Sequence, residues 1–362
     1  MLVSFVPMAG LNESQPGFQF KAERPFGTVR KGFTHFAEGD VLFAKITPCM
    51  ENGKGAVARG LRNRLGCGTT ELHVIRPLVG ISPEYIYRFG GILSCLDAQN
   101  GKVLWRKQST DDYQGIPYKS DAAMSPLLEG GMCFMHLGGK TNGALFAFDL
   151  INGSPKWKWT GDGPASSSPV VMTVQSTKQL VTLTAKSVVG LSLADGKLLW
   201  QIPFEAVQGN NTTSVVSEQT VIYTGQGKGT FAVRIEGQGS EFAAIPLWTN
   251  KQIGARFTTP VLKDGLLYGY NGHFSCANAK TGTTLWEDAT NRGNSAAVVD
   301  AGSIILALTV NSELVAFKPS DKEYIELAHF KVADTETWAH PVVSGSRVFV
   351  RDRESVALWT IE

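Results

Sequence analysis

A short sequence frame recurs along most of this chain and limits the folds open to it. Residues 97–105 and 149–157 share Asp at the first position, Gly at the fifth and Trp at the ninth, and residues 196–200 and 282–286 keep the Gly-x-x-x-Trp part. Asp or Asn with a nearby Gly favours a tight turn, because the Asx side chain caps its own backbone and Gly tolerates a positive φ. Apolar runs before these turns, and short strands ending in Trp after them, predict repeated β-hairpins.

Each repeat predicts four short strands, most clearly at residues 125–128, 132–135, 144–148 and 155–159. Later units begin with similar short motifs, 36 to 46 residues apart. This spacing is typical of the four-stranded blades of a β-propeller. They start at Ser168, Thr213, Thr259, Ser295 and His340. Stacking around an axis buries both faces of such small sheets. Because helical patterning is almost absent, we exclude parallel α/β folds.

The two ends of the repeat region are incomplete. Only residues 92–96 and 103–107 remain of the first blade, and residues 341–361 supply three strands of the last. The strand that carries Trp105 is expected to complete the last blade. We therefore predict a mainly β fold, a propeller of about six to seven four-stranded blades with its first blade incomplete, preceded by a small α+β domain.

Composition narrows the class of protein further. A hydrophobic content of 43% with 18% charged residues indicates a globular chain rather than a disordered one. No apolar run reaches the roughly 18 residues of a membrane span, and the first residues lack the basic segment of a signal peptide. As the sequence stands, we expect a cytoplasmic monomer. The five cysteines form no CxxC or adjacent pair, so we expect free thiols, with no zinc site and no disulfide framework.

Residues 1–89 share nothing with the repeats. They hold 11 Lys and Arg against 7 Asp and Glu, whereas the rest of the chain holds 23 against 25. Strands are predicted at residues 2–7, 40–46 and 71–76, and a helix is predicted to start at Pro83, with Ser82 as its N-cap.

Residues 3–8, 33–54 and 68–77 closely resemble the target recognition domain of type I restriction-modification specificity subunits. The resemblance covers nearly all of residues 1–89 and implies sequence-specific DNA binding. Within the matching motif, the residue types that approach phosphates and bases are Lys45, Thr47, Asn52, Gly53 and Lys54. Arg59, Arg62 and Arg64 form an expected patch for the DNA backbone. The alternative is a solvated turn beside a solvated basic face.

The turn motifs of residues 90–362, and the Ser-Pro-Val-Val motif with which a repeat begins, resemble those of the pyrroloquinoline-quinone-like β-propeller repeat family. Members of this family are often extracytoplasmic. In such a propeller, a Trp on each outer strand docks against the neighbouring blade. The matching residues here are Trp105, Trp157, Trp200, Trp248 and Trp286.

The same resemblance raises the possibility of a quinone-dependent dehydrogenase. Those enzymes hold calcium with acidic and amide side chains, use an Asp base and commonly carry adjacent cysteines, which this chain lacks. We therefore expect no catalytic activity and no cofactor. The hypothesis preferred here is a scaffold that binds a protein or a small ligand on a propeller face lined by residues 161–168, 208–213 and 291–294. The alternative reading of each of these stretches is a plain connecting loop.

Two unrelated resemblances meet near Gly90, without a Pro-, Ser- or Gly-rich linker. The predicted domains are residues 1–89, a partial DNA-recognition module, and residues 90–362, the propeller. Three functions follow: a binding scaffold fused to that module, a fragment of a DNA specificity subunit, and a dehydrogenase relative. Because the join falls inside both families, we also consider a truncated or wrongly joined reading frame.

Overall fold

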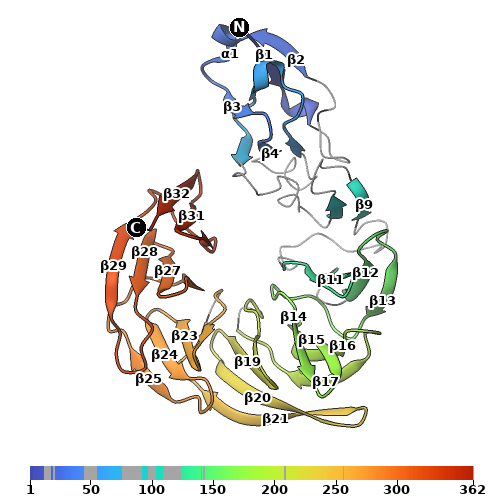
Figure 1. Ribbon diagram of the computed structural model, residues 1–362, viewed down its shortest axis with the longest axis vertical. Coiled ribbons are helices and arrows are strands. Elements are labelled where there is room, and N and C mark those ends of the chain that lie inside the picture. Colours follow the sequence, from blue (N-terminus) through green and yellow to red (C-terminus); the bar gives the residue numbers. More distant parts are fainter. Residues whose placement is uncertain are drawn as a thin grey trace. The chain divides into compact units, whose positions relative to one another are not determined.

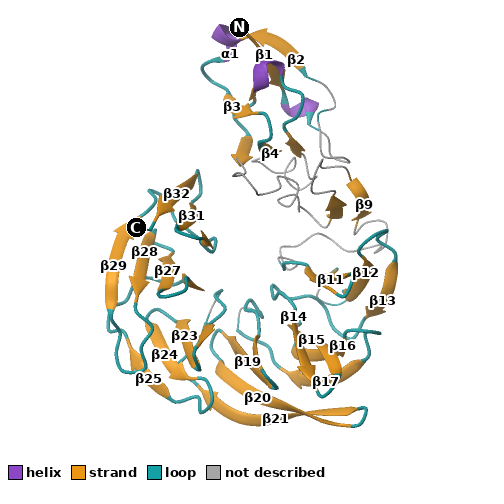
Figure 2. Cartoon of the chain, in the orientation of Figure 1, coloured by secondary structure: helices purple, strands orange, loops and turns teal. Residues whose placement is uncertain are grey.

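The computed structural model describes residues 1–11, 18, 21–44, 55–75, 92–96, 103–108, 124–139, 141, 143–207, 209–255 and 257–361. The chain divides into two compact units, Met1–Tyr118 with Phe148–Ser154 and Lys119–Ala147 with Pro155–Glu362. The boundary predicted at residues 89 and 90, and the helix predicted from Pro83, lie outside the described residues. Strands dominate both units (Figure 2).

The first part of unit 1 forms two small sheets. One has the order β2 (Ala22–Pro25), β1 (Leu2–Val6), β6 (Leu65–Gly68) and β3 (Thr34–Ala37), with β1 and β6 parallel. The other has the order β5 (Gly55–Val57), β4 (Val41–Ala44) and β7 (Leu72–Ile75). The described helical segments here are short: α1 (Phe26–Val29) and two 3-10 turns, Met8–Gly10 and Arg62–Arg64.

A hairpin of β8 (Ile92–Leu96) and β9 (Val103–Gln108) also belongs to unit 1. It forms a two-stranded sheet in which Cys95 lies opposite Trp105. Strand β9, which we expected to complete the last blade, pairs with β8.

Unit 2 contains consecutive antiparallel sheets, which run from green to red in Figure 1. Among the described residues, five of these sheets have four strands and the last has three. Their strands are β10–β13 (Leu127–Glu129, Met132–Leu137, Ala144–Asp149, Pro155–Trp159), β14–β17 (Val170–Val174, Thr177–Leu183, Ser187–Ser192, Leu198–Pro203), β18–β21 (Val215–Ser217, Thr220–Gly225, Gly229–Gln238, Glu241–Asn250), β22–β25 (Val261–Lys263, Leu266–Tyr270, Phe274–Asn278, Thr284–Glu287), β26–β29 (Ala296–Asp300, Ile305–Thr309, Glu313–Phe317, Glu326–Lys331) and β30–β32 (Val342–Ser344, Arg347–Arg351, Val356–Thr360).

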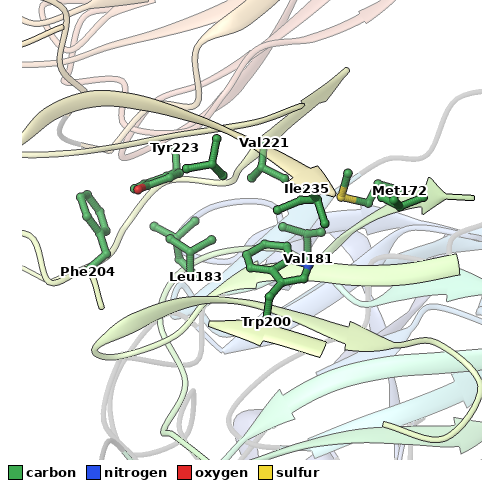
Figure 3. Close-up of a cluster of buried hydrophobic side chains, with 11 residues drawn as sticks. Met172, Val181, Leu183, Trp200, Phe204, Val221, Tyr223 and Ile235 are labelled. Atoms are coloured by element: carbon green, nitrogen blue, oxygen red, sulfur yellow. The ribbon is translucent and has the colours of Figure 1, made fainter. Parts of the chain in front are cut away.

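Each pair of consecutive sheets shares an apolar core, as expected of propeller blades. Between the sheets β14–β17 and β18–β21, the core includes Met172, Leu183, Trp200, Tyr223 and Ile235 (Figure 3). Similar clusters join each of the remaining neighbouring pairs of sheets in unit 2. The second and third strands are apolar on both faces because a sheet in the middle of the series is covered on both sides.

Candidate functional site

The tryptophans of the repeat frame tie one copy of the repeat to the next. Indole Nε1 donates to a turn carbonyl of the following copy in four cases, at 2.8 to 3.1 Å: Trp105 to Leu150, Trp157 to Leu193, Trp248 to Ala279 and Trp286 to Ser320. Trp200 differs, because its Nε1 donates to Gln179 Oε1 of its own sheet at 2.7 Å while its ring packs in the core shared with the next sheet.

Loops that join the fourth strand of one sheet to the first strand of the next lie at the same end of the sheets. We call this end the connector face and define it by residues 160–169, 204–207, 209–214, 251–255, 257–260, 288–295 and 332–341. The three polar loops considered from sequence fall within it. Side chains fix connectors to the segments beside them, since Asn210 Nδ2 donates to Thr184 O at 2.8 Å and Thr337 Oγ1 donates to Thr309 O, at the end of β27, at 2.6 Å.

Two large aromatic side chains meet on the connector face. Phe257 precedes β22 and is 39% exposed, whereas Trp338 precedes β30 and is 54% exposed. Their ring centroids lie 6.3 Å apart in an edge-to-face arrangement. The pair therefore brings together two connectors that are separated along the chain by the sheets β22–β25 and β26–β29.

Buried polar groups hold both aromatic residues in place. Thr258 and Thr337, their neighbours in sequence, are each 3% exposed, and Thr258 Oγ1 donates to Ala296 O. Trp338 Nε1 donates to Glu336 Oε2 at 3.1 Å. Desolvation lowers the pKa of His340, and a hydrogen bond to the backbone of Phe257 partly offsets this effect. The site is thus an exposed aromatic pair on an anchored backbone.

Neither Phe257 nor Trp338 is among the site residues predicted from the sequence. Trp338 stands outside the Gly-x-x-x-Trp frame, in the polar stretch 333–340. A Trp that the repeat does not need is the one signal that could have identified it.

The connector at residues 288–295 carries a charged cluster with a structural role. Arg292 Nη2 lies 3.2 Å from Asp288 Oδ2 and 2.7 Å from Glu326 Oε2, and Tyr324 OH donates to the same Glu326 oxygen at 2.8 Å. Burial acts to raise the pKa of Glu326, but hydrogen bonds from Tyr324 and His329, together with Arg292, hold it below its usual range. The cluster links this connector to β29.

The described histidines and cysteines form no common site. His136 is buried, and its Nε2 lies 3.0 Å from Asp162 O. Desolvation lowers its pKa to about 4. His35 Nε2 lies 3.2 Å from Val29 O. Among the described residues, Cys67, Cys95, Cys133 and Cys276 are in the thiol form, outside any disulfide. Among the residues that the structure describes, no group of three or more His, Cys, Asp or Glu side chains is placed to hold a metal ion.

The predicted DNA-contacting residues are only partly described. Lys45, Thr47, Asn52, Gly53 and Lys54 lie outside the described residues. Arg59, Arg62 and Arg64 are exposed around a 3-10 turn. The Arg62 guanidinium lies 3.8 Å from Glu23 Oε1, so an acidic side chain stands beside the expected basic patch.

Comparison with known proteins explains the repeated sheets. The family model described as outer membrane protein assembly factor BamB matches residues 84–288. The chain belongs to this family. BamB of Yersinia pestis is 23% identical over 293 residues, which cover 78% of this chain and 73% of that protein. The crystal structure of BamB from Moraxella catarrhalis superposes with a TM-score of 0.54 at 14% identity, covering 75% of this chain and 77% of that one, which supports the propeller fold.

A second relative accounts for a shorter segment. The EcoEI type I restriction enzyme specificity subunit of Escherichia coli is 49% identical over 76 residues, or 21% of this chain. This chain spans only 13% of the length of that subunit. Both family resemblances seen in the sequence are therefore confirmed. In the described part of the chain, no helix is long and apolar enough to cross a membrane.

Proposed function

We propose that this member of the BamB family is a non-catalytic scaffold that binds a partner protein through its connector face. The exposed Phe257–Trp338 pair carries this proposal. Trp side chains dominate the energetics of protein interfaces when a partner covers them, because they bury a large apolar area at a low cost in conformational entropy.

The surroundings of the pair favour a protein over a small ligand. Each ring projects from a connector in which the adjacent Thr is buried and hydrogen-bonded. The backbone is therefore already ordered, and binding costs little further conformational entropy. Glu336 and Arg353 are paired beside Trp338, at 2.5 Å between Arg353 Nη2 and Glu336 Oε2. An apolar centre with a charged rim is the usual composition of a protein interface.

Since the relatives are named as outer membrane protein assembly factors, the partner is sought in that machinery. The test is a binding titration of the whole chain against an outer membrane protein assembly complex purified without its own BamB. Phe257→Ala combined with Trp338→Ala should weaken binding by at least about tenfold, the range of an interface hot spot. Phe330→Ala, at an exposed aromatic on β29, is the matched control. Equal binding by both variants and the native chain would exclude the connector face.

A second function, DNA binding through residues 1–89, has its own supporting observation. The match to a type I specificity subunit is far stronger per residue than the match to BamB. On this proposal, Lys45 and Lys54 reach the DNA, with Arg59, Arg62 and Arg64 on the phosphate backbone. The chain would then be a fusion of a partial DNA-recognition module with a propeller scaffold.

Salt dependence separates this function from the first. DNA affinity should fall steeply between low and physiological salt, because each neutralised phosphate releases counterions. Lys45→Ala and Lys54→Ala should each weaken binding of a duplex in an anisotropy assay, whereas Lys318→Ala, at an exposed residue of unit 2, should not. Absence of any salt-sensitive binding would eliminate the DNA function and leave the scaffold proposal untouched.

A further inference from the structure

The sheet β30–β32 ends in a strand edge that a fourth strand covers in the other sheets of unit 2. In the other sheets of unit 2, a fourth antiparallel strand pairs with the third. Strand β32 occupies the third position, since it pairs with β31 as β28 pairs with β27. Among the described residues, β32 has no second neighbour. Within the described part of the chain, its outer backbone groups are therefore available to an added strand.

One face of this sheet is apolar and exposed. Val342, Phe349 and Leu358 lie opposite one another across the three strands. Val342 is 59% and Leu358 is 49% exposed. The corresponding row of the preceding sheet is Val299, Leu306 and Ala316. There Leu306 is only 2% exposed, because it packs in a core shared with the last sheet.

Two cations flank the apolar row. Arg347 lies two residues before Phe349 on β31, and Arg351 lies two residues after it. Because side chains two residues apart on a strand point to the same face, both arginines share the face of Phe349. Both are exposed, and neither has an ion-pair partner among the described residues. They lie opposite Thr360 and Val356 of β32, to either side of Leu358. The surface is thus apolar in the middle and positively charged toward both ends.

The register of the other sheets limits which residue can lie opposite Leu358. In three of them, the fourth strand places Trp opposite a small third-strand residue: Gly190 with Trp200, Ala232 with Trp248 and Cys276 with Trp286. A Cβ at Gly190 would lie only 2.1 Å from the Trp200 ring. Leu358 holds that small-residue position, so an incoming strand needs a small residue there instead of Trp.

From these four features we propose that the edge of β32 binds an extended acidic peptide segment of another polypeptide. The segment adds as a fourth, antiparallel strand. It places Gly or Ala opposite Leu358 and acidic side chains two residues to either side, where they reach Arg347 and Arg351. Strands two positions apart are separated by about 9.6 Å, a gap that Arg and Glu side chains span together. This surface is separate from the connector face.

The probe is a labelled synthetic peptide of about nine residues, with Ala at its centre, Glu two residues to either side and Thr or Val elsewhere. Anisotropy with the whole chain should show saturable binding that weakens with salt. Arg347→Glu with Arg351→Glu should weaken it by at least about tenfold, a change of 1.4 kcal/mol. The same variant should gain affinity for a peptide with Lys in place of Glu. Lys186→Glu with Lys318→Glu is the charge-matched control.

Two further peptides test the strand geometry. N-methylation of the amides that face β32 should abolish binding, whereas N-methylation of the alternate amides should not. A peptide with Trp at its centre should bind more weakly than the Ala peptide. The proposal is overturned if none of these peptides binds, if Lys and Glu peptides bind alike, or if the chain instead forms a dimer through β32. None of these outcomes depends on Phe257 or Trp338, so this proposal and the connector-face proposal fail independently.

Discussion

The backbone of Gly196 lies directly against the indole of Trp157. A Cβ placed on Gly196 would be 2.5 Å from Trp157 Cε3, and Gly196 has φ = +73°. Trp105 with Gly153 and Trp248 with Gly282 repeat this contact, at 2.6 and 2.4 Å. The Gly of one frame therefore receives the Trp of the preceding outer strand, which is why the two residue types recur together.

Gly196→Ala should destabilise the fold more than a positive φ alone explains. Gly265, with φ = +77° and nothing within 4 Å of a Cβ, provides the control. Gly265→Ala should cost about 1–2 kcal/mol for the left-handed conformation. Gly196→Ala should cost about 1–3 kcal/mol more, because the indole must move. Urea unfolding of both variants measures the difference, and equal midpoints would show that the contact is unimportant.

Trp157→Ala should remove about 3–5 kcal/mol from the free energy of unfolding. The substitution deletes the ring that packs in the core between β10–β13 and β14–β17 and also the hydrogen bond to Leu193 O. Trp338→Ala is the control, because its ring is exposed and should contribute less than about 0.5 kcal/mol. Similar losses in both variants, measured by thermal or urea unfolding, would contradict the assigned role of Trp157.

The buried His136 should make the fold sensitive to acid. Its pKa is about 4 in the folded chain, because burial disfavours the imidazolium, against 6.5 for a free imidazole. The unfolded chain therefore takes up the proton first as pH falls. Stability from this group is complete above pH 6.5 and declines toward pH 4, by about 3 kcal/mol in total.

Urea unfolding between pH 4 and 7.5 of the native chain and of His136→Gln checks this expectation. The stability difference between the two should shrink or reverse at the acid end. A difference that stays constant with pH would show that His136 does not titrate as inferred.

Backbone N–H groups at the starts of consecutive first strands donate to hydroxyls of the next sheet. Ser125 N donates to Ser168 Oγ at 2.9 Å, Ser168 N to Thr213 Oγ1 at 3.1 Å, and Thr213 N to Thr259 Oγ1 at 3.0 Å. Thr213→Val keeps the shape but leaves the Ser168 N–H without its acceptor, at a cost of about 1–3 kcal/mol. Thr249→Val, on the exposed side of β21, should be nearly neutral in the same unfolding assay.

The sequence allowed the blades to be predicted because their determinants are local. Gly196 and Trp200 specify a turn and an outer strand within a few residues, and the hydroxyl at each strand start marks the next sheet. The Phe257–Trp338 pair could not be predicted in this way. It depends on how two connectors that are two sheets apart along the chain approach one another, and neither residue belongs to the repeat.

The open edge of β32 also depends on strand pairing rather than on local sequence. The strand 356–360 has the apolar pattern of an interior strand, so its free edge becomes visible only when its neighbours are known. The DNA contacts predicted at residues 45–54 lie outside the described residues and remain predictions. Trp200 shows the limit of the repeat frame, because its indole N–H turns to Gln179 of its own sheet.

The most direct test of the account is site-specific photo-crosslinking from the connector face. A photoreactive phenylalanine at position 338, in the whole chain mixed with an outer membrane protein assembly complex that lacks BamB, should crosslink to one component of that complex. The same group at position 330 should not. Crosslinking at position 338 alone would support a binding scaffold that acts through the connector face. Equal crosslinking from both positions, or none from position 338, would contradict it.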